Sequence, residues 1–253
     1  MAFDWGKRMR LMIIAGILAV VLVLAGGIAF AVIYKTPTCT DRTQNQGEAG
    51  VDCGGPCTYL CTAQVQSPNI IFVRSLSLRG GRTDVVASIQ NPNTKAGAKH
   101  APYTIELYGT DAVLIGRVTG TIDLPAGKTV PLFVRAAAQG STVDHAFISF
   151  NPSTISWSES SSVYVLPRVS DSTLAVSDSP RVTTTLSNET YDPMLGVRAV
   201  AVVYDEMGTV IAASETVVPA LVAQTRVPIT FTWNEPFVAS TPRVEILPII
   251  PLP

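Results

Sequence analysis

Ile105-Glu-Leu-Tyr-Gly-Thr-Asp-Ala-Val-Leu-Ile-Gly116 contains two short apolar runs on either side of a turn, and Val202-Val-Tyr-Asp-Glu-Met-Gly-Thr-Val-Ile-Ala212 repeats that pattern. The two tyrosines, Tyr108 and Tyr204, are 96 residues apart. Two further blocks recur at nearly the same offset, with Asn91 and Asn188 97 residues apart and Pro131 and Pro228 also 97 apart. A constant offset through three blocks indicates a tandem duplication.

Each copy has the composition of a β protein. In the first copy, apolar or alternating runs separated by Gly, Pro and Asn turns predict strands at 70–78, 84–90, 103–108, 113–118, 130–136 and 146–150. Short strands at this spacing are typical of a sandwich. The fold class is therefore mainly β, with two tandem immunoglobulin-like β-sandwiches, at 65–157 and 158–253.

The repeated block resembles the FxLYD family of extracytoplasmic β-sandwich domains and, more distantly, the late-embryogenesis-abundant type 2 (WHy) sandwich. Its residues in the first copy are Leu107, Tyr108, Gly116, Pro125, Gly127 and Phe133, with Gly109 in place of the family's Asp. The second copy has Val203-Tyr204-Asp205 and Gly208, but Leu221 replaces the turn glycine. The resemblance covers roughly 170 residues; it implies a fold and no particular ligand.

Four residues have expected structural roles within the repeat. Tyr108 and Tyr204 close alternating strands, where each ring is expected to fill the end of a sandwich while its hydroxyl reaches the backbone. Asn91 and Asn188 follow a strand, and a buried amide there would tie a loop to the neighbouring strand.

Residues 11–34 contain no charged or strongly polar side chain, and as a helix they would extend about 36 Å. That length crosses a hydrocarbon core of about 30 Å with some tilt. Lys7, Arg8 and Arg10 precede the span, which predicts a cytoplasmic tail at 1–10 and an extracytoplasmic remainder. The alternative is a signal peptide cleaved after Ala29-Phe-Ala31; the uncleaved anchor in the cell membrane is favoured because the apolar run is too long.

The next segment, 35–64, holds all four cysteines and is called the collar below. They are Cys39, Cys53, Cys57 and Cys61. In an exported segment an even number of cysteines predicts two disulfides, with three pairings open. Zinc is the alternative, but the usual C-x2-C spacing is missing.

The stretch Thr40 to Cys57 resembles small cysteine modules of secreted and surface proteins, of the form C-x-D-x3-N-x2-E-x-G-x-D-C-G-G-x-C. Its closely spaced oxygen side chains are Asp41, Asn45, Glu48 and Asp52. Calcium takes six to eight such oxygens, so one hypothesis is a structural calcium site. The other is a solvated turn whose Asp and Asn side chains cap their own backbone. No other cofactor is expected.

The sequence offers little for catalysis. None of the common hydrolase, metalloprotease or nucleotide-binding motifs occurs. The only histidines are His100, expected in a loop, and His145, near a strand start, whose neighbour Asp144 would face the opposite side of the strand. Asn188-Glu-Thr190 fits a glycosylation sequon.

Two further segments and the net charge are also informative. Residues 151–162 are serine-rich and predict a short, semi-rigid link in which Ile155 and Trp157 either finish the first sandwich or pack at the junction. The tail 246–253 predicts either an edge strand blunted by prolines or an exposed polyproline segment. A net charge of −1 without a basic patch argues against nucleic-acid binding.

These features favour a membrane-anchored, non-enzymatic structural or protein-interaction component of a cell-envelope or surface assembly. Its expected partners are the membrane, through 11–34, and envelope or surface proteins. The alternative is a sensory ectodomain that binds a small molecule or glycan between its sheets or between its domains. The sequence sets no oligomeric state.

Overall fold

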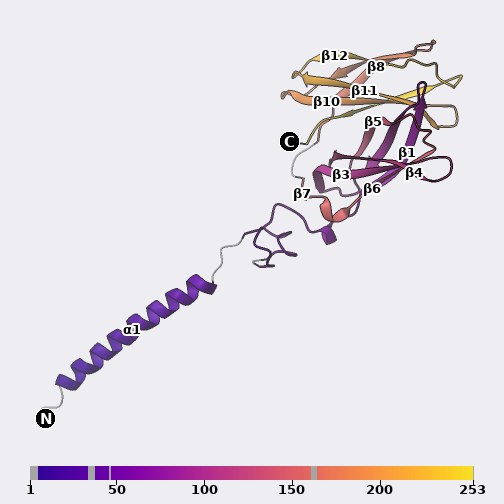
Figure 1. The fold of residues 1–253 in the computed structure, drawn as a ribbon. Helices are drawn as coiled ribbons and strands as arrows, with labels where there is room; N and C mark the ends of the chain where they lie inside the picture. Colours follow the sequence, from indigo (N-terminus) through magenta and orange to yellow (C-terminus); the bar gives the residue numbers. More distant parts are fainter. Residues whose placement is uncertain (1–4, 34–37, 46, 161–163, 253) are drawn as a thin grey trace.

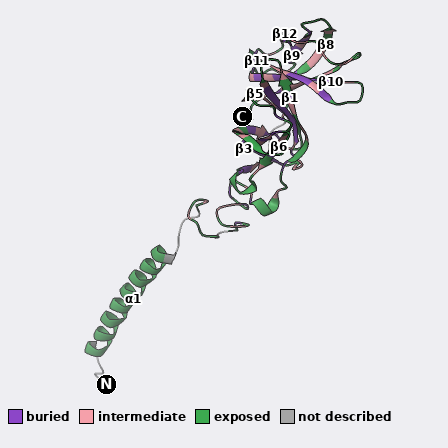
Figure 2. Ribbon diagram, turned by 45° about the vertical axis from the view of Figure 1, so that its right-hand side comes forward, coloured by how far each residue is buried: buried purple, intermediate pink, exposed green. Residues whose placement is uncertain are grey.

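The computed structural model describes residues 5–33, 38–45, 47–160 and 164–252. It begins with one α-helix, α1 (Trp5–Ile33), in which Gly6–Val32 is long and apolar enough to cross a membrane, with a mean hydropathy of 2.9. Figure 1 shows α1 pointing away from the strands, and Figure 2 shows its surface as exposed. A helix that is apolar all round and exposed requires an apolar environment such as lipid. Tyr34, the last residue of the predicted span, lies outside the described residues.

The first sandwich consists of two antiparallel sheets around one core. One sheet has the order β1-β2-β5, with β1 (Asn69–Leu78), β2 (Arg82–Gln90) and β5 (Thr129–Gln139). The other has the order β4-β3-β6, with β3 (Ala96–Tyr108), β4 (Leu114–Leu124) and β6 (His145–Phe150), and β7 (Trp157–Glu159) pairs with the start of β3. Val85, Ile89, Ile105, Leu107 and Trp157 are fully buried between the sheets.

The second sandwich repeats this strand order. One sheet is β12-β9-β8, with β8 (Arg168–Ala175), β9 (Arg181–Ser187) and β12 (Arg226–Thr232). The other is β11-β10-β13, with β10 (Met194–Tyr204), β11 (Val210–Leu221) and β13 (Arg243–Ile249). Val182, Leu186, Val197, Leu221 and Phe231 form the centre of its core. Two short 3-10 helices, η1 (Thr62–Gln64) and η2 (Pro152–Thr154), complete the elements.

A buried asparagine occupies the same place in both sandwiches, as the sequence predicts. Asn91 and Asn188 are each 1% exposed. The Asn91 side-chain amide donates to the carbonyl of Leu124 at 3.1 Å, and the Asn188 amide donates to that of Leu221 at 3.0 Å. In each copy the amide therefore satisfies a carbonyl at the end of the neighbouring strand, which would otherwise be buried without a partner.

A third apolar cluster joins the two sandwiches face to face. The sheet β1-β2-β5 contributes Leu76 and Val86, and the sheet β11-β10-β13 contributes Val200, Val202 and Tyr204 to the same cluster. The cluster also contains Val210, Ala213 and Ile249, with Phe72, Phe133 and Leu247 packed against it. β10 is consequently buried on both faces, and the four sheets are stacked in one series (Figure 1).

Polar contacts fasten the same junction at both ends. The amide of Leu252, beyond β13, donates to Asp123 in β4 at 2.9 Å. At the tip of the β1–β2 hairpin, the amide of Arg79 donates to the Glu235 carboxylate at 2.6 Å. The two sandwiches thus form one unit, tighter than the semi-rigid link that the sequence predicts.

The outermost sheet faces carry polar residues where the junction carries apolar ones. The first sandwich's free face has Thr104 and Glu106 at the repeat positions of Val200 and Val202. The second sandwich's free face has Thr183 opposite Thr230, at the positions where the junction has Val86 opposite Phe133. The duplicated sheets have therefore diverged according to whether their outer face is covered.

Two expectations from the sequence are wrong in the first sandwich. β3 begins at Ala96, well before residue 103, so that His100 lies inside a strand and not in a loop. The strand continues through this region because the register shifts between Ala98 and Ala101, where His100 has a φ of 49°. The His100 amide donates to Asp123 at 2.8 Å, which stabilises this bulge.

The tyrosine hydroxyls also differ from expectation. Tyr108 donates to Glu106 at 3.0 Å and Tyr204 donates to Glu245 at 3.2 Å, so both reach a carboxylate and not the backbone. Trp157 starts a strand of the first sandwich, as one of the two alternatives predicted. The tail prediction is confirmed in part: 246–249 lie in the edge strand β13, whereas 250–252 lie beyond it.

Exchanging the repeat-equivalent residues tests the junction. Val202→Glu places an unpaired carboxylate in the third cluster and is expected to destabilise the protein by at least about 3 kcal/mol, separating the two sandwiches into two unfolding transitions. Glu106→Val, the reverse exchange on the solvated face, is expected to change stability by less than about 1 kcal/mol. Calorimetry of the full chain in detergent measures both. A single, unshifted transition for Val202→Glu would contradict the proposed coupling.

Tyr164 generates a pH prediction. Its hydroxyl donates to the carbonyl of Ile250 at 2.7 Å and accepts from the Ile250 amide at 3.0 Å, and burial raises the pKa of Tyr164 to about 12. The folded state therefore retains a proton that the unfolded chain loses near pH 10, so this stabilisation is complete below about pH 10 and is lost as the pH rises toward 12.

Tyr164→Phe is expected to cost about 1 kcal/mol at pH 7 and to reduce the decline in stability between about pH 10 and 12. Urea unfolding across that range checks it, with Tyr191→Phe as the control because Tyr191 is 90% exposed. Superimposable pH profiles for the wild type and Tyr164→Phe would refute the prediction.

Candidate functional site in the disulfide collar

Two disulfides organise the collar. Cys39 pairs with Cys57 and Cys53 pairs with Cys61, with S–S distances of 2.04 and 2.00 Å, which selects one of the three pairings left open by the sequence. The described part of the collar has few buried apolar side chains. A segment of this kind relies on cross-links because it cannot bury enough apolar area by itself.

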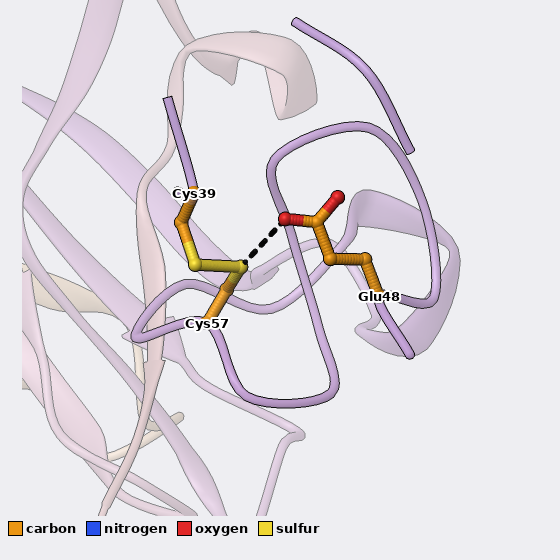
Figure 3. Close-up of side chains that lie close together, drawn as sticks. All are labelled: Cys39, Glu48 and Cys57. Atoms are coloured by element: carbon orange, nitrogen blue, oxygen red, sulfur yellow. Dashed lines mark hydrogen bonds between the residues drawn. A yellow bond between two sulfur atoms is a disulfide. The ribbon is translucent and has the colours of Figure 1, made fainter. Parts of the chain in front are cut away.

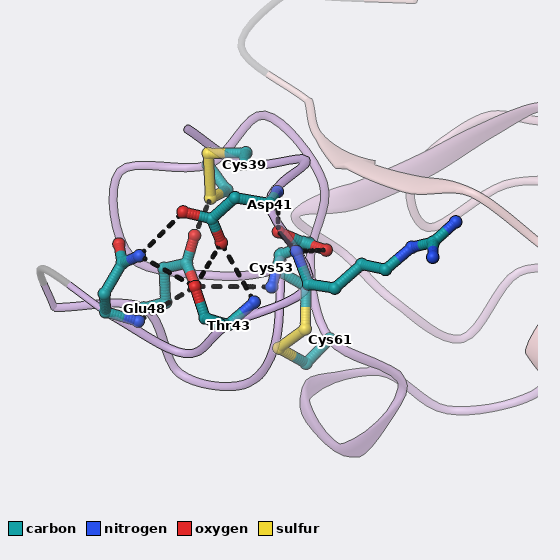
Figure 4. The surroundings of a disulfide bond; sticks show 10 residues. Cys39, Asp41, Thr43, Glu48, Cys53 and Cys61 are labelled. Carbon is teal, nitrogen blue, oxygen red and sulfur yellow. Dashed lines mark hydrogen bonds between the residues drawn. A yellow bond between two sulfur atoms is a disulfide. The ribbon is translucent and has the colours of Figure 1, made fainter. Parts of the chain in front are cut away.

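The Asp52 carboxylate ties the two disulfide loops together. It accepts hydrogen bonds from the amides of Asp41, at 2.9 Å, and Arg42, at 3.0 Å (Figure 4). Arg42 and Asp52 both have positive φ, 60° and 56°. Asp52 directly precedes Cys53. Its side chain therefore holds the segment after Cys39 close to the second disulfide.

Asp41 caps the turn that follows it. Its carboxylate accepts from the amide and hydroxyl of Thr43 and, at 2.9 Å, from the side-chain amide of Asn45. This is the local side-chain-to-backbone pattern that Asp adopts in turns. Two of the four predicted ligands, Asp41 and Asn45, are thus in direct contact.

Glu48 is the most buried residue of the predicted ligand set, with 8% of its surface exposed. One carboxylate oxygen lies 3.3 Å from the Asp52 amide and 3.4 Å from the Asn45 amide. The other lies 3.1 Å from Sγ of Cys57 (Figure 3). The side chains of Cys39, Glu48 and Cys57 lie close enough together to bind one metal ion. The two sulfurs are joined in a disulfide, however, and offer no thiolate ligand.

The contacts of the four residues match the self-capping alternative more closely than a calcium site. The oxygens of Asp41 and Asp52 face N–H groups, which would have to turn away to admit a cation. Among the described residues, Oδ1 of Asn45 is the one side-chain oxygen of this set that is buried without a hydrogen bond. A calcium site needs six to eight oxygens. Calcium binding by this loop stays a prediction.

The distal end of the collar is attached to the first sandwich. The amide of Leu60 donates to the carbonyl of Trp157 at 2.8 Å, and Tyr59 forms an isolated β-bridge with Ser158. Gln66 and Asn93 exchange two hydrogen bonds of 2.8 Å. Leu60 and Val65 pack against the first core, so the collar continues directly into the sandwich.

The histidines do not form a catalytic arrangement with any described residue. The His100 and His145 side chains are 75% and 67% exposed. The sequence argument that Asp144 and His145 point apart is wrong, because Nδ1 of His145 lies 2.7 Å from the Asp144 carboxylate. The His145 ring also stacks on Phe147, and the Ser75 hydroxyl donates to the Asp144 backbone carbonyl at 3.1 Å, away from the imidazole–carboxylate contact.

Asn188 of the predicted sequon is unsuited to glycosylation in the folded chain. Its side-chain amide is buried and donates to the carbonyls of Asp192 and Leu221, while its oxygen accepts from Thr190. A glycan on this nitrogen would replace one of its two hydrogens, so at least one of the two donated bonds would be lost inside the protein.

The residues that join the sandwiches were not predicted from the sequence. Their signal was present: Ala199–Tyr204 is an uninterrupted apolar run, which is typical of a strand buried on both faces. The burial of Glu48 was not predicted either, because the sequence gives no signal for it.

Comparisons with known proteins add no family. No protein-family model matches the chain, and no curated protein matches it. Among solved structures, red sea bream transglutaminase aligns with 74% of this chain and 29% of its own, at 14% identity and a TM-score of 0.26. The coconut allergen cocosin aligns with 74% of this chain and 86% of its own, at 9% identity and a TM-score of 0.12. These low scores carry no structural or functional argument.

The collar contacts lead to a prediction for Asp52→Ala. Because the lost partners are backbone N–H groups, the substitution is expected to destabilise the collar by about 1–3 kcal/mol, equally in EDTA and in calcium. Proteolysis of the full chain near Cys39, under non-reducing conditions, measures collar opening. Asp111→Ala, which removes a comparable cap on the amide of Val113 in an exposed hairpin, is the control. Calcium-dependent protection of the wild type that Asp52→Ala abolishes would instead support the metal site.

Proposed function

We propose that the protein is a single-pass, membrane-anchored, extracytoplasmic spacer in a cell-envelope or surface assembly. The observation that carries this proposal is the continuous mechanical connection from Cys39 to Ile249. The disulfides cross-link the collar, Leu60 attaches it to the first core, and the third apolar cluster attaches the second sandwich. Such a chain presents its far end at a fixed distance from the membrane.

The proposed orientation places the N-terminus in the cytoplasm. Lys7, Arg8 and Arg10 lie at the start of α1, and cations collect on the cytoplasmic side of membrane spans. Disulfides persist in oxidising compartments, which agrees with an extracytoplasmic collar. We propose no catalytic role, since the two histidines are exposed and the carboxylates of the collar are used as caps.

We also propose that both sandwiches are FxLYD-like domains. The supporting features are the hairpins that follow Tyr108 and Tyr204. In each, an amide after the tyrosine bonds across the turn, from Gly109 to Val113 and from Asp205 to Thr209. Gly208 has a φ of 80°, which a tight hairpin requires.

The spacer proposal is tested by changing the rigidity of the connection without touching either sandwich. A twelve-residue Gly-Ser insertion after Gln64, combined with Leu60→Gly to remove the side chain that packs against the first core, would loosen the attachment of the collar to the first sandwich. The same insertion after Ser177, in an exposed turn between β8 and β9, is the matched control. Each full-length variant is crosslinked in its native membranes, purified and examined by mass spectrometry.

The wild type and the Ser177 insertion are expected to recover the same envelope or surface proteins in stoichiometric amounts, and the Gln64 insertion is expected to lose most of that recovery. Recovery of the wild-type protein alone would overturn the assembly role. Equal recovery with the Gln64 insertion would overturn the requirement for a fixed spacing.

A further inference from the structure

A groove lies where the two sandwiches meet at the β1–β2 hairpin end. Its volume is about 620 Å³, within the range of small-molecule sites. The first sandwich contributes Phe133 and three arginines, Arg79, Arg82 and Arg135. The second contributes β11 and residues 233–238 of the β12–β13 loop. Figure 1 shows the strands β1 and β5 beside β11 at this junction.

The groove is open because small residues line its floor. In β11, Ala213 faces the junction while Ala212 packs in the second core on the opposite face, so this strand presents a small side chain to the groove. The loop above is held in place by the Trp233 indole N–H, which donates to the carbonyl of Ala213 at 3.2 Å. Phe237 packs edge-on against Trp233 with ring centroids 5.1 Å apart. The groove is therefore preformed.

One of the cationic side chains that line the groove has no ion-pair partner among the described residues. Glu235 is paired with Arg79, and Glu215 is paired with Arg198 at 2.6 Å. Asp84 is buried and is occupied by Arg82, as described next. Across the described part of the chain, Arg135 makes no ion pair and its side chain donates no hydrogen bond, although it is exposed in the groove.

Arg82 has donors left over in the same wall. Its Nε lies 3.1 Å from Asp84 Oδ1 but without hydrogen-bond geometry, so this buried N–H has no hydrogen-bond partner among the described residues. Asp84 Oδ1 is instead the acceptor for the amide of Ala136 at 2.8 Å. Nη2 of Arg82 donates to Asp84 Oδ2 at 3.2 Å, and the 36% of the side chain that is exposed leaves terminal N–H groups for the groove. Guanidinium N–H groups match the geometry of a carboxylate.

We propose that this groove binds a small molecule in which a carboxylate is joined to an apolar group. The carboxylate contacts Arg135 and the free donors of Arg82, and the apolar group lies on Phe133 and Trp233. The lining is mixed, with aromatic side chains beside cationic ones, and it therefore suits a ligand that combines an apolar group with an anion. This site goes beyond the spacer role and does not depend on it.

The intrinsic tryptophan fluorescence of the protein reports binding at this site. Its three tryptophans are Trp5 in α1, Trp157 in the first core and Trp233 in the groove, so a ligand in the groove contacts one of them. The full chain in lipid nanodiscs is titrated with 3-phenylpropionate while tryptophan emission is recorded. 3-Phenylpropanamide, an uncharged molecule of the same size and shape, is the matched ligand.

A saturable emission change is expected with the carboxylate, with the amide binding at least about threefold more weakly. Arg135→Gln is expected to weaken carboxylate binding about three- to tenfold and to leave amide binding unchanged, because it removes one charge-assisted contact at a partly exposed site. Arg226→Gln, which removes an exposed arginine of β12 outside the groove, is expected to bind as the wild type does.

Trp233→Phe is expected to abolish the emission change while isothermal calorimetry still detects binding. Four results would overturn the proposal: no saturable binding of the carboxylate, equal binding of the amide, equal effects of Arg135→Gln and Arg226→Gln, or an emission change that survives Trp233→Phe. Loss of partner recovery in native membranes would leave this result intact, so the two proposals fail separately.

Discussion

The burial of β10 on both faces is the constraint on which the rest of the molecule depends. Alternate residues of this strand enter two different cores: Val197, Ala199, Ala201 and Val203 fill the second sandwich, while Val200, Val202 and Tyr204 fill the junction. A sheet with one apolar face would have let the second domain move freely on its link. Because both faces are apolar, separating the second sandwich from the first would expose the apolar junction face to water, which is unfavourable. The groove and the fixed arrangement of the two sandwiches both follow from this packing.

Duplication explains how such a junction arises and why the outer sheet faces differ from the inner ones. The contact is between non-equivalent sheets, β1-β2-β5 of the first copy and β11-β10-β13 of the second. A contact between unlike faces can in principle repeat without end, as in an open filament. Here Thr104 and Glu106 at one end of the stack and Thr183 and Thr230 at the other replace the apolar residues that would continue it. Polar substitution on the outer faces therefore terminates the series.

The sequence predicted the fold well because its strands are short, alternate in polarity and are separated by turn residues. It predicted the repeat because Asn91 and Asn188 are required at equivalent places by the carbonyls they satisfy. It failed where a distant segment decides the conformation: the strand through His100 depends on Asp123, and the pairing of Cys39 with Cys57 depends on the path of the loop. For the collar, the sequence identified residues that lie in contact, but it did not decide between a calcium site and turns capped by their own side chains. The groove could not be predicted because both sandwiches line it, with Phe133 from the first and Trp233 from the second.

The disulfide between Cys39 and Cys57 has a consequence for the behaviour of the protein under load. Tension along the chain enters the collar at residue 39 and leaves it beyond residue 57, so the covalent bond carries it and the 17 residues between the two cysteines bear none of it. Reduction of this one bond would free only the chain from Cys39 to Cys53, because the second disulfide still bridges Cys53 to Cys61. At about 3.3–3.6 Å per extended residue, that segment spans roughly 50 Å. The first disulfide therefore sets the contour length between α1 and the sandwiches, which keep their fold when it is reduced.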